Sequence, residues 1–201
     1  MPADARPLSF DFFNRPADRV ARDLLGCRLA VCGPDGTTTR HMVVETEAYL
    51  GAHDLACHGS KGMTARTAVM FGPAGVWYVY LCYGMHWMLN VVTGAEGVPA
   101  AVLIRGVVGQ AGPGRLTRAL GIGREFNGRR ATRSTGLWFE PGMPVSSRLI
   151  DRTPRIGVAY AGDWAAKPLR FVVDPGRLTM VEGGTVRAAR RTRSTGPCMR
   201  R

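Results

Sequence analysis

The sequence lacks the features that place a protein in a membrane or cross-link it. No apolar run approaches the roughly 20 residues that a helix needs to span a bilayer, and the first residues show no basic and then apolar signal pattern. The five cysteines are an odd number without a CxxC pair, which argues against a zinc ribbon or a disulfide framework. We therefore expect a cytoplasmic protein with reduced thiols.

Four generic catalytic signatures are also missing. The chain contains no Walker A loop, no GxGxxG after a strand, no HExxH and no GxSxG. Their absence argues against P-loop NTPases, dinucleotide-dependent oxidoreductases, zinc proteases and nucleophile-elbow hydrolases.

Acidic residues and lysine are scarce. Lys and Arg total 27 against 15 Asp and Glu, which gives a net charge of +12 and an isoelectric point near 10.5. All of these cations except Lys61 and Lys167 are arginine, a bias that phosphate binding and the base composition of the genome explain equally well. The charge predicts a polyanionic partner, with nucleic acid favoured over an anionic membrane surface.

Hydrophobic residues make up 45% of the 201 residues, which fits one globular domain. Apolar spacing predicts a helical start over residues 8–26, a helix over residues 115–120, and strands over residues 27–32, 41–49, 76–82, 86–92 and 100–106. Tyr83-Gly84 is predicted to be a hairpin turn, and the last structured segments are expected at residues 155–161 and 169–173. Because strands and helices interleave without a βαβ period, we expect an α+β fold.

The composition changes abruptly after residue 182. From Gly183 onward the chain has almost no apolar residues and carries six arginines: Arg187, Arg190, Arg191, Arg193, Arg200 and Arg201. We expect one domain over residues 1–182, followed by a basic and disordered tail over residues 183–201.

Polar residues that could do chemistry gather within fourteen positions: Glu45, Glu47, Tyr49, His53, Asp54 and His58. In a strand of period two, Glu45, Glu47 and Tyr49 share a face. A carboxylate delivered by a strand end into a loop-lined pocket can serve as a general base that activates water. A solvated acidic edge strand, or a metal site made of His53, Asp54 and His58, would use the same residue types.

Aromatic residues form a second cluster: Trp77, Tyr78, Tyr80, Tyr83 and Trp87. Alternation along a strand assigns one face of this stretch to the core. Tyr83 differs, because a large aromatic at a hairpin tip is poorly placed for burial. In a protein of charge +12, an exposed aromatic tip suits insertion between bases.

A set of motifs in fixed order resembles the alkyladenine (3-methyladenine) DNA glycosylase family. The first are His41-Met-Val-Val-Glu-Thr-Glu-Ala-Tyr-Leu-Gly51, Asp54-x-Ala-x-His58, Met70-Phe71 and Tyr78-Val-Tyr-Leu-Cys-Tyr-Gly-Met85. The later ones are Val102-Leu-Ile-Arg105, Gly112-Pro-Gly-Arg-Leu-Thr-Arg-Ala-Leu-Gly-Ile122, Arg155-Ile-Gly-Val158, Gly162-Asp-Trp164 and Lys167-Pro-Leu-Arg-Phe171. The resemblance runs from about Phe12 to Val173.

The resemblance implies a single compact α+β domain with a mixed, mainly antiparallel curved sheet, surrounding helices and a protruding β-hairpin. It implies a monomeric, metal-free and cofactor-free enzyme that flips damaged purines out of duplex DNA and hydrolyses the N-glycosidic bond. In a bacterium, such an enzyme would be associated with the nucleoid.

The resemblance also assigns roles to residues. Glu47 matches the base that activates water, and Arg105 matches a residue that supports it. The walls that hold the flipped base correspond to Tyr49, His58 and Tyr80, and Asn90 corresponds to the residue that screens purines for a 2-amino group. The wedge in the helix corresponds to Tyr83, and backbone contacts are implied for Met85 and His86.

Two departures from the family pattern are visible. Thr67 stands where the family has Asn, so a hydrogen bond that orders this loop could differ, and the similarity fades beyond Asp174. A competing hypothesis from another class is a non-catalytic nucleic-acid-binding module whose tyrosines only stack. That hypothesis explains the charge and the aromatics but leaves the cluster from Glu45 to His58 without a role.

Overall fold

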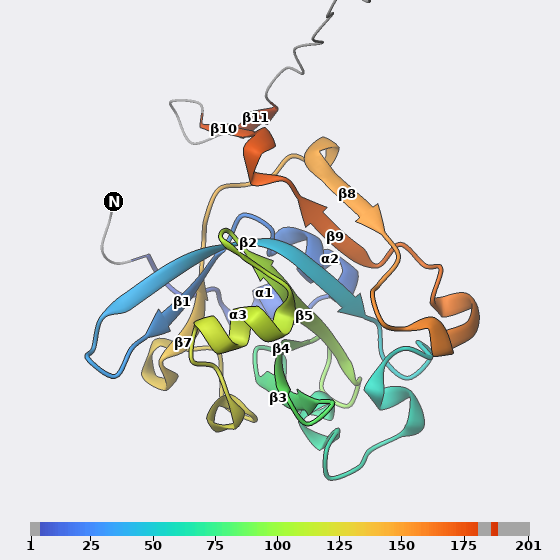
Figure 1. Cartoon of the computed structure of the whole chain (residues 1–201). Helices are drawn as coiled ribbons and strands as arrows, with labels where there is room; N and C mark the ends of the chain where they lie inside the picture. Colours follow the sequence, from blue (N-terminus) through green and yellow to red (C-terminus); the bar gives the residue numbers. More distant parts are fainter. Residues whose placement is uncertain (1–4, 181–185, 189–201) are drawn as a thin grey trace, which may run out of the picture.

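The long strand β2 (Thr38–Tyr49) organises the fold. In this computed structural model, which describes residues 5–180 and 186–188, nine strands form one sheet of order β3–β4–β5–β2–β1–β7 (Figure 1). β6 is added beside β5, β9 beside β2 and β8 beside β9. All pairings between the described strands are antiparallel, which confirms the α+β prediction with a mainly antiparallel sheet.

The bounds of the other strands are as follows: β1 Arg28–Cys32, β3 Trp77–Cys82, β4 His86–Thr93, β5 Ala100–Val107, β6 Gln110–Ala111, β7 Leu137–Glu140, β8 Ile150–Thr153, β9 Arg170–Val173, β10 Leu178–Met180 and β11 Val186–Ala188. The α-helices are α1 Phe10–Phe13, α2 Ala17–Asp23 and α3 Pro113–Ala119. Short 3-10 helices are η1 His58–Lys61, η2 Ala68–Phe71, η3 Arg124–Phe126, η4 Arg133–Thr135, η5 Ser147–Leu149, η6 Ala159–Trp164 and η7 Pro175–Arg177.

The two halves of β2 pair with different strands. Its first half pairs with β1, and its second half lies between β5 and β9, where Glu47 is opposite both Leu103 and Arg170. Thr46 points to the helix side, where its Oγ1 donates a hydrogen bond of 2.8 Å to the carbonyl of Ala21 in α2. Alternation therefore turns Glu45, Glu47 and Tyr49 to the opposite side of the sheet.

The predicted helical start over residues 8–26 is divided in two by Pro16, whose extended backbone (φ −49°, ψ 135°) separates α1 from α2. The chain leaves α2 through Gly26 at φ 85°, a left-handed conformation that glycine adopts without strain. A Cβ at this position would also collide with the carbonyl oxygen of Met143.

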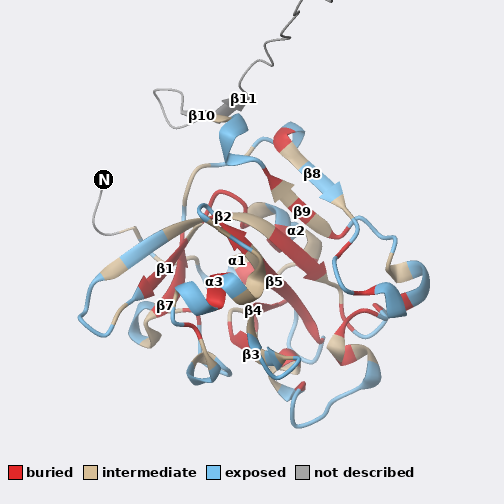
Figure 2. Ribbon diagram, in the orientation of Figure 1, coloured by how far each residue is buried: buried red, intermediate tan, exposed pale blue. Residues whose placement is uncertain are grey.

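Apolar side chains fill the space between the helices and the sheet. Figure 2 shows most of the central strands as buried and much of the connecting loops as exposed, with buried stretches in the loop that follows β2. The main cluster joins Val20 of α2 and Leu24, which follows α2 directly, to Leu29, Ile104 and Phe139 of the sheet, all fully or almost fully buried. Burial of this kind stabilises a fold by about 25 cal/mol per Å² of apolar surface.

The chain ends in a part that the sequence prediction treated as a tail. Val186–Ala188 form β11, which pairs with β10. The rest of the predicted tail, residues 183–185 and 189–201, lies outside the described residues.

Candidate active site

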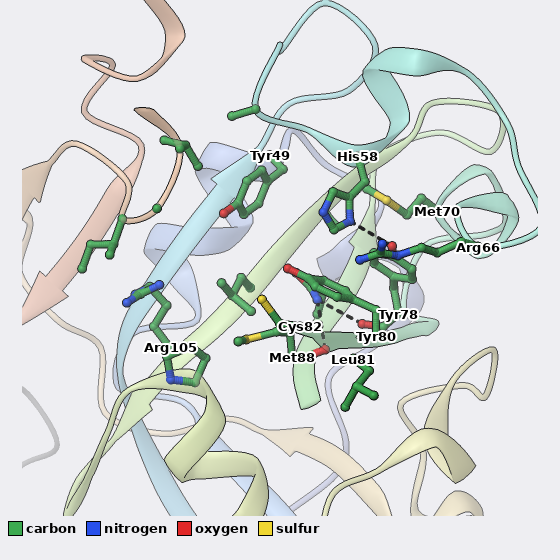
Figure 3. Close-up of a pocket in the computed structure, with 18 of the residues that line it drawn as sticks. Tyr49, His58, Arg66, Met70, Tyr78, Tyr80, Leu81, Cys82, Met88 and Arg105 are labelled. Atoms are coloured by element: carbon green, nitrogen blue, oxygen red, sulfur yellow. Dashed lines mark hydrogen bonds between the residues drawn. The ribbon is translucent and has the colours of Figure 1, made fainter. Parts of the chain in front are cut away.

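A cavity of about 520 Å³ opens beside the β3–β4 hairpin. Its walls come from the strands β2 to β5, from the loop that includes η1, and from the segment that follows β8. Figure 3 shows Tyr49, His58 and Tyr80 around this space, with Arg105 and Arg66 on opposite sides of it. The walls combine flat aromatic groups with a few polar ones, a composition typical of sites for small planar ligands.

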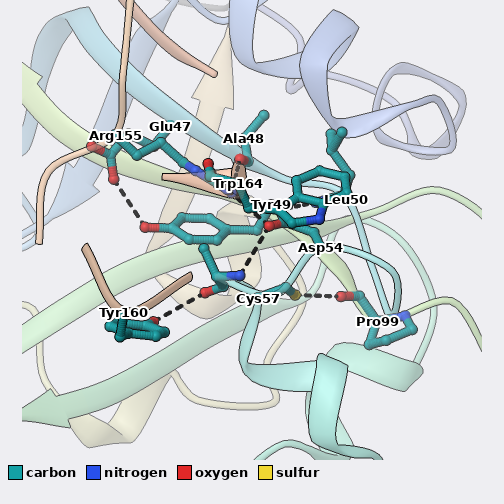
Figure 4. A network of polar contacts seen from close by, with 11 residues as sticks. Glu47, Ala48, Tyr49, Leu50, Asp54, Cys57, Pro99, Arg155, Tyr160 and Trp164 are labelled. Atoms are coloured by element: carbon teal, nitrogen blue, oxygen red, sulfur yellow. Dashed lines mark hydrogen bonds and ion pairs between the residues drawn. The ribbon is translucent and has the colours of Figure 1, made fainter. Parts of the chain in front are cut away.

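The carboxylate of Glu47 lies directly behind the cavity wall. The side chain is fully buried, and three groups that line the cavity bind it. The hydroxyl of Tyr49 donates to Oε2 at 3.0 Å (Figure 4). The backbone N–H of Ile156 donates to Oε1 at 2.8 Å, and Arg105 Nη1 is 3.5 Å from Oε1. Burial raises the pKa of Glu47 above its usual value, while Arg105 and the two hydrogen bonds oppose this rise.

Glu45 orients Arg105 rather than facing the cavity. Its Oε1 accepts hydrogen bonds from Arg105 Nε at 3.0 Å and from Arg170 Nε at 2.6 Å. With Nε held in this way, the other end of the Arg105 guanidinium is directed at Glu47. The two carboxylates on β2 therefore have different surroundings: Glu47 lies behind the cavity wall, and Glu45 holds Arg105.

His58 and two tyrosines form the aromatic wall. His58 Nδ1 is 3.0 Å from the hydroxyl of Tyr78, and its ring centroid is 4.6 Å from that of Tyr80. Arg66 lies over the other part of this wall, with its guanidinium carbon 5.0 Å from the Tyr80 ring centroid. Burial, together with Arg66, lowers the pKa of His58 to about 4, and burial raises the pKa of Tyr80.

Asn90 is fixed against the hairpin at the edge of the cavity. The residue is buried, and its amide nitrogen donates to the carbonyls of Tyr78 at 3.1 Å and Met88 at 3.3 Å. These two bonds come from the strand pair itself, so the position of the side chain follows from the register of β3 and β4.

The hairpin tip is a tight turn in a left-handed conformation. Met85 N–H donates to the carbonyl of Cys82 at 3.1 Å, and the central residues Tyr83 and Gly84 have φ of 50° and 69°, as a type I′ turn requires. The Tyr83 side chain is 88% exposed and also lines the mouth of the cavity. Met85 is exposed as well.

Helix α3 packs against the base of this hairpin. Thr117 Oγ1 donates to the carbonyl of Trp87 at 2.9 Å. Gly114 approaches so closely that a Cβ there would be 2.9 Å from the ring of His86.

The structure brings most of the residues singled out from the sequence to one place. Tyr49, His58, Tyr80, Asn90, Arg105 and Tyr83 line the cavity, and Glu47 lies behind it. Met85 and His86 lie on the hairpin but are not among the lining residues.

The residues of the alternative metal site point to other partners. His53 packs edge-on against Trp164 with ring centroids 5.4 Å apart, and Asp54 is bound by Arg155. Within residues 5–180 and 186–188, no three His, Cys, Asp or Glu side chains gather closely enough to hold a metal ion. No helix in that part of the chain is long and apolar enough to cross a membrane.

Three groups at the site were not singled out from the sequence. They are the backbone N–H of Ile156, the guanidinium of Arg155 and the side chain of Arg66. The only available signal for the first two was their place in the motif Arg155-Ile-Gly-Val158, since a backbone donor leaves no trace in residue type.

A family model and individual protein sequences that are similar to this chain agree with one another. The family model for methylpurine-DNA glycosylase matches residues 11–111 and 108–177. A protein of Myxococcus xanthus assigned as a 3-methyladenine DNA glycosylase is 53% identical over 171 residues, which cover 81% of this chain and 87% of that protein. A protein of Legionella pneumophila with the same assignment is 46% identical over 176 residues, covering 84% of this chain and 94% of that protein.

Proposed function

This chain belongs to the methylpurine-DNA glycosylase family, and on that premise we propose that it initiates repair of alkylated DNA by base flipping and water-mediated hydrolysis. It would excise 3-methyladenine, with 7-methylguanine, hypoxanthine and ethenoadenine as further candidate substrates. In this proposal the enzyme acts as a monomer on duplex DNA and leaves an intact abasic site.

The aromatic wall supports capture of a flipped base. Extruding a base costs a few kcal/mol, least for a damaged or mispaired one. Stacking on aromatic side chains returns about 1–3 kcal/mol per base. Tyr49, His58 and Tyr80 supply such surfaces, and Asn90 would test the edge of the purine.

The observation that carries the proposal is the buried Glu47 carboxylate, whose three partners all line the cavity. Cleavage of an N-glycosidic bond builds positive charge on the sugar, as in glycoside hydrolysis. Glu47 would stabilise that charge and accept the proton of the attacking water, which then adds to the anomeric carbon as the purine leaves. A cationic alkylated purine leaves as a neutral base, so it needs no proton from the protein.

The hairpin tip supports a wedge. Tyr83 projects into solvent at the mouth of the cavity, so its ring can fill the gap that a flipped nucleotide leaves. Met85 and His86 follow it on the same hairpin, where backbone contacts with DNA are expected. The arginine-rich surface would supply the sequence-independent affinity for phosphates.

Release of free base from alkylated duplex DNA under single-turnover conditions tests the proposal. The Glu47→Gln variant should bind lesion DNA almost normally but excise the base about 10²–10⁴ times more slowly, since an amide cannot accept the proton of water. Glu140→Gln is the matched control, because Glu140 is also fully buried but is bound by Arg40 and Trp138.

Two outcomes would count against the proposal. Excision by Glu47→Gln within a few-fold of wild type would remove Glu47 as the base. A wild-type protein that binds alkylated DNA but releases no base would support the non-catalytic module instead.

A further inference from the structure

We propose that Asp54 and Arg155 form a positioning pair, which holds both hydrogen-bond donors of Glu47 in place. The inference rests on the proposed function, because it concerns the ionised carboxylate that activates water. Neither residue touches the reacting atoms in this proposal.

The pair is a bidentate and fully buried ion pair. Arg155 Nη1 donates to Asp54 Oδ2 at 2.6 Å, Arg155 Nη2 donates to Asp54 Oδ1 at 2.8 Å, and both side chains have no exposed surface. Asp54 also accepts the backbone N–H groups of Leu50 and Ala56 at 3.0 and 3.1 Å. Asp54 is thus anchored in the turn that follows β2 and presents a rigid acceptor to the guanidinium.

The first link to Glu47 runs through Tyr49. Arg155 Nη1 also donates to the carbonyl of Ala48 at 2.8 Å, and its guanidinium carbon lies 4.8 Å from the centroid of the Tyr49 ring. The planar cation therefore supports one side of the ring whose hydroxyl donates to Glu47 Oε2.

The second link runs through the backbone. Ile156 follows Arg155 directly, and its N–H donates to Glu47 Oε1 at 2.8 Å. The residues from Arg155 to Val158 are not part of any strand or helix of the structure. The side chain of Arg155 anchors the start of this segment to the turn after β2, while Val158 at its end is buried against Ala56 (Figure 4).

The orientation of the Arg155 guanidinium leaves one of its N–H groups buried without a hydrogen bond to any described residue, which lowers the stability of the fold. Arg155 Nε is buried without a hydrogen-bond partner among the described residues. A buried ion pair is seldom more stabilising than well-packed apolar residues of the same volume. A pair that leaves one donor unpaired, yet contacts both supports of Glu47, fits a positioning role better than a purely stabilising one.

Other charged or titratable groups act on Glu47 from the elements packed around it. They are Glu45 and Tyr49 on β2, Arg105 on β5, Tyr80 on β3 and Arg155 itself. Arg170 on β9 is opposite Glu47 in the strand register, and its guanidinium binds Glu45. Arg105 is held by Glu45, which does not contact the Asp54–Arg155 pair, so disturbing this pair leaves the ion pair between Arg105 and Glu47 in place. The two hydrogen bonds that favour the ionised carboxylate are what would weaken.

The test measures single-turnover excision of alkylated bases at saturating enzyme as a function of pH. Arg155→Lys keeps the charge but loses the planar, bidentate contact, and Asp54→Asn keeps the shape but loses the charge. In both variants, we expect the acid limb of the profile to move up by about one pH unit, with excision about tenfold slower below it. Tyr49→Phe, which removes one donor directly, should shift the limb in the same direction.

Two controls separate positioning from general damage. Arg40→Lys disturbs another ion pair with a fully buried carboxylate, Glu140, and should leave the acid limb where it is. Titration of the ¹³C-labelled Glu47 carboxyl by NMR reports its ionisation without any catalysis, and its midpoint should rise in Arg155→Lys and Asp54→Asn.

An unchanged carboxyl midpoint and an unchanged acid limb in a folded Arg155→Lys protein would overturn the positioning role. If that variant does not fold, Asp54→Asn decides by the same two readouts. Failure of the proposed function is distinguishable, because Glu47→Gln would then excise bases at nearly the wild-type rate. Loss of excision in Glu47→Gln with no shift in Arg155→Lys would reject only the positioning pair.

Discussion

The Nδ1 atom of His58 lies 3.0 Å from the hydroxyl of Tyr78, inside the aromatic wall of the cavity. Burial, reinforced by the nearby charge of Arg66, lowers the pKa of the imidazole to about 4. At neutral pH the ring is therefore uncharged, and under the proposed function it would offer a flipped purine a flat surface without repelling a cationic one.

This ionisation state can be measured directly. We expect the His58 resonances to titrate near pH 4 rather than near the ordinary value of 6.5. Because the folded pKa is depressed, His58 contributes stability that is present above about pH 6.5 and is lost as the pH falls toward 4. His58→Gln should lose less stability than wild type over that interval, and a His58 midpoint near 6.5 would contradict the prediction.

The contribution of Glu47 to folding stability should depend on pH in the opposite direction to that of His58. Burial raises its pKa in the folded protein, so its contribution to stability is present below the unfolded pKa and is lost as the pH rises through the folded pKa. Glu47→Gln should therefore be more stable than wild type at pH 7, with the difference shrinking toward pH 4. Thermal unfolding over pH 4 to 8 measures this, and a wild type that is the more stable protein at pH 7 would disprove it.

Substitutions at Tyr83 can distinguish the role of its backbone in the turn from the role of its ring in capturing a flipped base. Its φ of 50° costs an L-residue about 1–2 kcal/mol, which glycine does not incur. Tyr83→Gly and Tyr83→Ala should both weaken capture of a flipped base, reported by a fluorescent base analogue, with little effect on undamaged duplex. The free energy of unfolding of Tyr83→Gly should be about 1 kcal/mol higher than that of Tyr83→Ala. Equal flipping with and without the ring would remove the wedge assignment.

Water rather than an amine should be the nucleophile. The only lysines are Lys61, exposed at the end of η1, and Lys167, whose Nζ lies 3.3 Å over the ring of Trp164. Arginine stays protonated and cannot form a Schiff base. Borohydride should therefore trap no protein–DNA adduct during turnover. An adduct that disappears in Lys61→Ala would establish an amine mechanism.

The long elements of the fold were predictable because their patterns are local. Alternation along residues 41–49, 76–82 and 86–92 identified β2, β3 and β4, although β2 begins three residues earlier. The helical start predicted over residues 8–26 contains two helices, α1 and α2, which Pro16 separates. The four-residue strands β7 and β8 were not assigned, since so short a run shows no period.

The site was predictable only where residue type carries the chemistry. Glu47, Tyr49 and His58 stand out as a polar cluster near a strand end, and the strand period places the first two on one face. The roles of Arg155 and Ile156 depend on contacts with Asp54 and Glu47 more than a hundred positions away. One of these contacts uses a backbone N–H, which leaves no trace in residue type, and the other joins two side chains that no local pattern could pair.

The packing of α3 against the hairpin has a mechanical consequence. Thr117 bonds to the carbonyl of Trp87, and Gly114 lies against His86, so the hairpin has little freedom to pivot about its base. Under the proposed function, a force that DNA exerts on Tyr83 would pass along the strand pair to α3 and the sheet. The hairpin would therefore keep its shape on contact with the duplex, and the DNA would deform instead at each base step.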